Sequence, residues 1–114
     1  MSEITEIKHK NENLNQASMA VIICPHDKIL ILKRPGTLRE ENFPNKWCLA
    51  GGGALQGETP TQNVIREVLE ETGIRLEPHM LHYLLNKHEG DKSYYFFYVR
   101  TEQQPNIMNV LDEH

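Results

Sequence analysis

The feature that most constrains this chain of 114 residues is a glycine triplet, residues 51–53, followed closely by a well-marked helix. The residues between the triplet and Gly73 carry the start and stop signals of a helix over 60–72. These signals are Thr59 as the N-cap, Pro60 at the first helical position, Gln62 to complete a capping box, and Gly73 as the C-terminal stop. The sequence therefore predicts a glycine loop that leads directly into a capped helix.

Three carboxylates of this helix fall on one side. On a helical wheel at about 100° per residue, Glu67, Glu70 and Glu71 lie within an arc of about 100°. Like charges at this spacing repel one another, but hard divalent cations take carboxylate oxygens as ligands. The opposite arc is the expected core stripe, made of Ile65, Val68, Leu69 and Thr72. A bare helix of this kind fits a solvated acidic face as well as a metal platform.

The surroundings of the helix favour the metal platform. Exposed carbonyls of the glycine triplet can ligate a cation, and backbone amides at the loop and helix start can hold phosphate oxygens. Arg66 is placed to pair with Glu70 one turn later. Glu58, just before the cap, suits a helix start. Together these residues indicate a cradle for a divalent cation and a phosphate chain.

The whole segment resembles the Nudix box and matches it at every fixed position. The matching pattern is Gly52-x5-Glu58-x7-Arg66-Glu67-Val68-x-Glu70-Glu71-x-Gly73-Ile74. The resemblance extends more weakly to the strands upstream, where the approach to the box looks MutT-like. It implies an α/β (α+β) fold, with an α/β/α sandwich built on a mixed β-sheet.

The resemblance also implies roles for individual residues. Glu67, Glu70 and Glu71, with the carbonyl of Gly51, would hold Mg²⁺, for which Mn²⁺ is an alternative. Glu67 would otherwise orient the catalytic water. Glu58 would support the turn into the helix through a salt bridge or hydrogen bonds. The candidates for catalysis are Glu67, Arg66, Glu70 and Glu113, and those for substrate binding are Gly52, Gly53, Arg34 and Arg39.

Composition limits the partners. The net charge of −4 and a pI near 5.8 give no basic footprint, so nucleic acid is not an expected partner. No run of 18 apolar residues predicts a membrane span, and the polar N-terminus has no secretory signal. Cys24 and Cys48 are interpreted as buried thiols of a cytoplasmic protein, because their spacing is not that of a metal site.

We expect a polar tail over residues 1–15 and one domain over 16–114. Strands are predicted over 17–24, 28–34, 46–50, 79–88 and 93–101, with the first two joined as a hairpin by a turn at 25–27. Nudix domains usually continue with a further strand and helix, which this chain is expected to lack. A partner or a swapped protomer, as in a homodimer, is one way to cover the sheet face that such a layer would cover.

The expected function is Mg²⁺-dependent hydrolysis of a pyrophosphate linkage by attack of water at phosphorus. The substrate class is a nucleoside diphosphate derivative, of the nucleoside triphosphate or nucleotide-sugar type. Two alternatives remain: a nucleotide-sensing module without turnover, and a pyrophosphohydrolase of RNA 5′ ends. The second would need a basic surface, which the composition does not provide.

Overall fold

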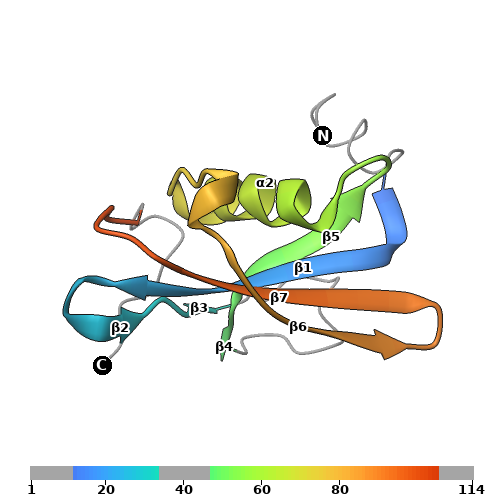
Figure 1. Ribbon diagram of the computed structural model, residues 1–114, viewed down its shortest axis with the longest axis horizontal. Coiled ribbons are helices and arrows are strands. Elements are labelled where there is room, and N and C mark those ends of the chain that lie inside the picture. The colour runs from blue at the N-terminus through green and yellow to red at the C-terminus, as the bar shows by residue number, and fades with distance from the viewer. Residues whose placement is uncertain (1–11, 34–46, 106–114) are drawn as a thin grey trace.

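The computed structural model describes residues 12–33 and 47–105, and their main body is a five-stranded mixed sheet with one helix across it (Figure 1). The expected fold class is therefore confirmed. Besides the short 3₁₀ turns η1 (Pro25–Asp27) and η2 (Pro78–Met80), the elements are β1 (Glu12–Cys24), β2 (Lys28–Ile29), β3 (Leu32–Lys33), β4 (Trp47–Cys48), β5 (Ala50–Leu55), α2 (Pro60–Thr72), β6 (His82–Glu89) and β7 (Lys92–Arg100).

Strand β1 is the centre of the sheet. It pairs antiparallel with β2 and β5 and parallel with β7, and β6 continues the sheet beyond β7 in antiparallel pairing. The strand starts at Glu12, five residues earlier than the Ala17 that the sequence predicts. The reason is tertiary: Glu12 and Asn13 pair with the end of β5, with an irregularity before Ala17. Because residues 12–16 are polar, the hydrophobic pattern did not predict that they belong to the strand.

The predicted hairpin between the first two strands is confirmed, since Ile23 pairs with Ile29 around η1. The predicted strand over 28–34 is wrong in its continuity. It is divided into β2 and β3, and β3 forms a separate two-stranded ribbon with β4. Leu30 and Leu32 both enter the core, as the two-residue alternation of a strand predicts. What the interruption changes is the pairing partner, which is β1 for β2 and β4 for β3.

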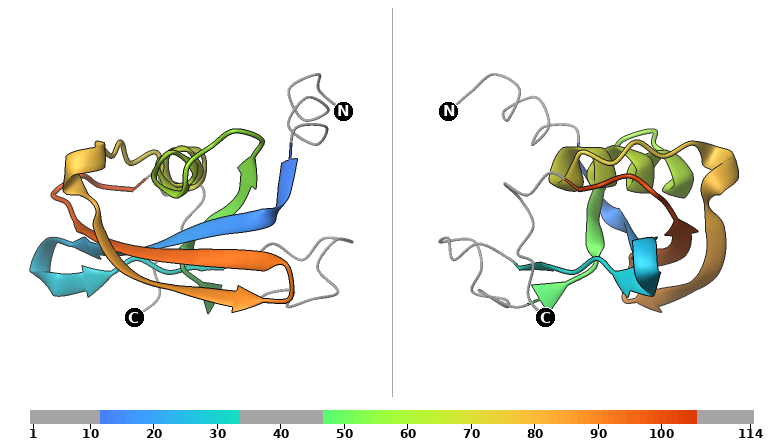
Figure 2. Two further views of the ribbon diagram at one scale, coloured as in Figure 1. Left: turned by 45° about the vertical axis from the view of Figure 1, so that its right-hand side comes forward. Right: turned by 90° about the vertical axis from the view of Figure 1, so that its left-hand side faces the viewer.

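The core lies between the sheet and α2, as the two views in Figure 2 show. Alternate residues of the central strands enter it, because side chains of a strand alternate between faces. They meet Val64 and Val68 of the helix; the sheet residues are Ala20, Ile22, Phe97 and Val99. Cys24 and Cys48 pack against this cluster but are half-buried, not buried as predicted. Burial raises the pKa of the Cys24 thiol.

The last two predicted strands are present as β6 and β7, which form an antiparallel hairpin that turns at Gly90 and Asp91 and extends away from α2 (Figure 1). Every residue of β6 is exposed. The expected first strand over 79–88 starts late, because residues 78–80 form η2. None of the helices among the described residues has the length and apolarity needed to cross a membrane.

Candidate functional site

Helix α2 begins and ends where the sequence predicts. The Thr59 hydroxyl accepts a hydrogen bond from the Gln62 amide at 3.1 Å, and the Gln62 side chain accepts one from the Thr59 amide at 2.9 Å. Gly73 adopts the left-handed conformation at the C-terminal end, and its amide donates to the Leu69 carbonyl at 3.0 Å. Both orphaned ends of the helix are therefore capped within the segment itself.

The glycine triplet is not the loop that the sequence predicts. Gly51, Gly52 and Gly53 lie inside β5, paired with Met19, Ser18 and Ala17 of β1. The turn comes later, at Gln56 and Gly57. Glycine runs are usual in turns, but here their lack of side chains allows two close approaches. A Cβ on Gly51 would lie 2.2 Å from the Ser18 carbonyl oxygen, and one on Gly52 would lie 2.9 Å from the Glu67 carboxylate.

One row of helix residues lies along these glycines. Glu71 accepts a hydrogen bond from the Gly51 amide at 2.9 Å, and Glu67 lies directly over Gly52. Asn63 donates from Nδ2 to the carbonyl oxygens of Gly52 and Gly53, at 3.2 Å each. The three helix residues are four apart in sequence, so they share one face. Two of the box carboxylates, Glu67 and Glu71, are thus packed against the glycines of β5 (the glycine strand).

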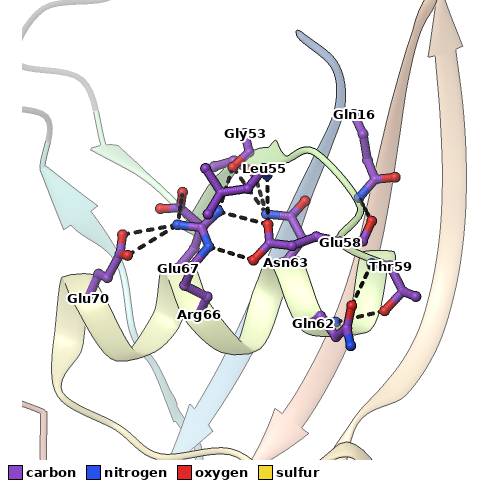
Figure 3. A network of polar contacts seen from close by, with 11 residues as sticks. Gln16, Gly53, Leu55, Glu58, Thr59, Gln62, Asn63, Arg66, Glu67 and Glu70 are labelled. Carbon is purple, nitrogen blue, oxygen red and sulfur yellow. Dashed lines mark hydrogen bonds and ion pairs between the residues drawn. The ribbon is translucent and has the colours of Figure 1, made fainter. Parts of the chain in front are cut away.

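Arg66 is the centre of the polar cluster (Figure 3). Its Nε donates to Glu58 at 2.6 Å and its Nη2 donates to the other oxygen of Glu58 at 3.0 Å, which makes a bidentate pair. Its Nη1 lies 3.2 Å from both Glu67 and Glu70, and Nη2 donates to the Gly53 carbonyl at 2.9 Å. The sequence predicts the Arg66–Glu70 pair; the other contacts come from the fold.

Charge and burial act in opposite directions on Arg66. Partial burial of the guanidinium lowers its pKa, but the hydrogen bond to Glu58 and the charges of Glu67 and Glu58 outweigh this and raise the pKa above its ordinary value. The hydrogen bond to Glu70 adds to the same effect. Arg66 therefore carries a positive charge at neutral pH.

Glu58 joins the helix to the end of β5. Its carboxylate accepts the Leu55 amide at 2.7 Å as well as both donors of Arg66. The carboxylate therefore closes the turn between strand and helix and fixes the guanidinium at the same time. This matches the support of the turn that the resemblance to the Nudix box implies.

The helical wheel places the core stripe correctly only in part, since two of its four residues are fully buried as expected. Leu69, expected in the core, is 38% exposed, whereas Glu67, expected on the open side, is only 5% exposed. Val64 and Asn63, which the predicted stripe leaves out, are fully buried. The buried face is rotated toward the carboxylates because the glycine strand leaves space for them.

The carboxylates have the donor chemistry for a hard divalent cation but are not gathered around one point. In residues 12–33 and 47–105, no group of three acidic, histidine or cysteine side chains is close enough to hold a metal ion. Glu67 and Glu70 face the Arg66 guanidinium, while Glu71 faces the Gly51 amide. Carboxylate and carbonyl oxygens are the ligands that Mg²⁺ prefers. The residues thus fit the ion in kind, and the Glu70 side chain, at 43% exposure, is the most open to solvent of the acidic partners of Arg66.

Three of the predicted site residues cannot be placed relative to the helix. Arg34, Arg39 and Glu113 lie outside the described residues. Asn63, by contrast, was missed by the sequence reasoning, although its position one turn before Glu67 on the same row is a signal that could have found it.

Parts of the chain are similar in sequence to known proteins. A nucleoside triphosphatase, NudI, of Enterobacter sp. (strain 638) is 51% identical over 35 residues, which is 31% of this chain and 25% of NudI. The zebrafish (Danio rerio) m7GpppN-mRNA hydrolase NUDT17 is 40% identical over 53 residues, or 46% of this chain and 17% of that protein. The chain therefore spans a quarter or less of the length of these relatives.

Solved structures show the same fold. The MutT structure from a study of Aliivibrio salmonicida and Vibrio cholerae superimposes with a TM-score of 0.66 at 25% identity, covering 80% of this chain and 69% of that one. The family model of the NUDIX domain matches residues 14–114. The capped helix, its carboxylates and the strand beneath them lie within this match, and the chain belongs to the Nudix family.

Proposed function

We propose that the protein hydrolyses a pyrophosphate linkage in a nucleoside diphosphate derivative, by attack of water at phosphorus. The observation that carries the proposal is the packing of α2 on the glycine strand. It places Glu67 and Glu71 over Gly52 and Gly51, with Glu70 beside them on the Arg66 guanidinium. All the acidic residues of the box are present, and modules that have lost catalysis commonly lack one or more of them.

Nudix proteins generally use divalent metal ions. We assign Glu67, Glu70, Glu71 and the carbonyl of Gly51 as the groups that would hold Mg²⁺, or Mn²⁺ in its place. When bound, such an ion polarises phosphate oxygens, neutralises charge and lowers the pKa of an attacking water. The Arg66 guanidinium, itself held by Glu58, would keep Glu67 oriented over the glycine strand.

Two assignments concern the substrate. Gly53 would let a phosphate oxygen approach the backbone closely, since a side chain there would meet nothing within 4 Å, whereas the corresponding space at Gly52, the other candidate, is taken by the Glu67 carboxylate. Arg34 and Arg39 would contact the terminal phosphate, and Glu113 would serve as a base or further ligand. The name of NudI favours a nucleoside triphosphate over a nucleotide-sugar. The acidic composition weighs against an RNA substrate, although NUDT17 is named as an mRNA hydrolase.

The decisive experiment incubates the protein with Mg²⁺ and nucleoside triphosphates, nucleotide-sugars, and an RNA oligonucleotide with a 5′ triphosphate, and separates the products by chromatography. We expect turnover of a small nucleotide, reduced roughly a hundredfold by Glu70→Gln or Glu71→Gln. Glu89→Gln, on the exposed strand β6, is the matched control and should change nothing.

Each other outcome selects a different reading. Binding of a nucleotide without products would favour the nucleotide-sensing module. Turnover of the RNA alone would favour a pyrophosphohydrolase of RNA 5′ ends. Full activity in both Glu70→Gln and Glu71→Gln would reject the assignment of these carboxylates to the metal.

A further inference from the structure

Asn63 is a polar residue in a place where an apolar one would suffice. It is fully buried beside Val64 on the packed face of α2, and its Oδ1 has no hydrogen-bond partner. A buried amide that leaves an acceptor unsatisfied costs free energy, on the order of 1–3 kcal/mol. Hydrogen bonds donated by the amino group of the same side chain, Nδ2, would have to offset this cost.

Helix capping does not account for Asn63. The N-terminal cap is already formed by Thr59 and Gln62, and the Asn63 backbone amide donates to the Thr59 carbonyl at 2.9 Å within the helix. Its side chain instead gives its donors to β5, with Nδ2 lying 3.2 Å from the carbonyl oxygens of both Gly52 and Gly53. The side chain therefore acts between the helix and the strand.

This link lies at one end of the row of residues that meets the glycine strand. Glu71, at the other end, accepts the Gly51 amide. The carbonyl of Gly51 belongs to the same stretch of β5 as this amide, so any slip of β5 along α2 would change its distance from both Glu67 and Glu71.

We infer that Asn63 is a positioning residue, whose amide fixes the glycine strand against α2 and so sets the Gly51 carbonyl relative to the box carboxylates. The part of this inference that concerns a cation rests on the proposed function. Groups that orient metal ligands typically change metal affinity about 10–100-fold when removed. The Asn63 amide donates to two carbonyls of the strand, so it acts through the backbone of the strand.

The test has one arm without metal and one with metal alone. In the first, amide hydrogen exchange measured by NMR should be roughly tenfold faster at Gly51 in Asn63→Ala, with the amide of Val68 in the middle of α2 unchanged. In the second, a titration with Mn²⁺ followed by electron paramagnetic resonance should show about tenfold weaker binding.

Two variants separate positioning from simple destabilisation. Gln62→Ala removes the neighbouring capping interaction but touches no glycine, so it should leave both the Gly51 exchange and the Mn²⁺ affinity nearly unchanged. Asn63→Leu keeps about the size of the side chain and suits this fully buried position, but it cannot donate to the carbonyls. It should accelerate exchange at Gly51 at least as much as Asn63→Ala.

The inference is overturned if Asn63→Ala leaves Gly51 exchange unchanged, if it accelerates exchange equally at Gly51 and Val68, or if Gln62→Ala weakens Mn²⁺ binding as much. Absence of Mn²⁺ binding in the unaltered protein would count against the proposed function instead. The metal-free arm would then still decide whether Asn63 anchors the strand.

Discussion

Two regions of the molecule contain similar ion pairs but differ in their exposure to solvent. One region is the contact between α2 and β5, and the other is the hairpin formed by β6 and β7. The Arg66–Glu58 ion pair is 2.6 Å long, with the two side chains 19% and 15% exposed. The Arg100–Asp27 pair, at the base of the hairpin, is 2.7 Å long, but its side chains are 63% and 80% exposed. The two ion pairs therefore differ in their exposure to solvent and hardly in their length.

The apolar residues divide in the same way. Val64 and Val68 under the helix are fully buried, whereas Tyr83, Leu84 and Leu85 of β6 are each about half exposed. We therefore expect substitutions at the helix contact to be costly and their chemical counterparts on the hairpin to be tolerated. The predictions below test this contrast, starting from the largest effect.

Gly51→Ala should have the largest effect. The added Cβ would lie 2.2 Å from a backbone oxygen, and the φ of +146° is one that L side chains rarely adopt. We expect a loss of at least about 3 kcal/mol in the free energy of unfolding, measured by urea denaturation. Gly52→Ala, which meets the carboxylate of Glu67, should cost less. Gly53→Ala meets nothing within 4 Å and is the matched control; equal losses at all three glycines would contradict the close packing of β5.

Arg66→Met should cost about 3 kcal/mol, because it leaves Glu58 and Glu67 partly buried without their cation. Arg100→Met removes a pair of nearly the same length and should cost under about 1 kcal/mol. Thermal unfolding of both variants, at low and high salt, gives the comparison. A similar shift in the two melting temperatures would show that burial does not separate the two pairs.

Val68→Ala should cost about 2 kcal/mol, from lost burial of two methyl groups and the cavity they leave. Leu85→Ala removes more atoms, but from a half-exposed position on β6, and should cost under about 1 kcal/mol. Both values come from denaturant titrations. If Leu85→Ala proved the more harmful, the exposed face of the hairpin would have to be covered in the folded protein.

Among the substitutions at the helix contact, Thr59→Ala should have the smallest effect, about 1 kcal/mol, because it removes one half of the capping box and leaves the packing intact. Circular dichroism during thermal unfolding measures the change. Thr59→Ser keeps the hydroxyl and should retain nearly the full stability; a loss equal to that of Thr59→Ala would assign the effect to packing of the methyl group.

Local signals made parts of the fold predictable. The ends of α2 depend on Thr59, Pro60, Gln62 and Gly73, which act on neighbouring backbone groups within one turn. The turn between β6 and β7 follows from Gly90 between two strands of β-forming residues. The start of β1 was not predictable in this way, because Glu12 and Asn13 are ordered by pairing with β5, far along the chain.

The candidate site divides along the same line. The spacing of Glu67, Glu70 and Glu71 was enough to predict that these carboxylates lie on one side of the helix, which made them the candidates for the chemistry. Only the tertiary structure decided that the glycine triplet is a strand, that Glu67 is buried against it, and that Asn63 joins helix to strand. The physical reason is that periodicity gives directions around a helix axis, whereas burial depends on what packs against each direction.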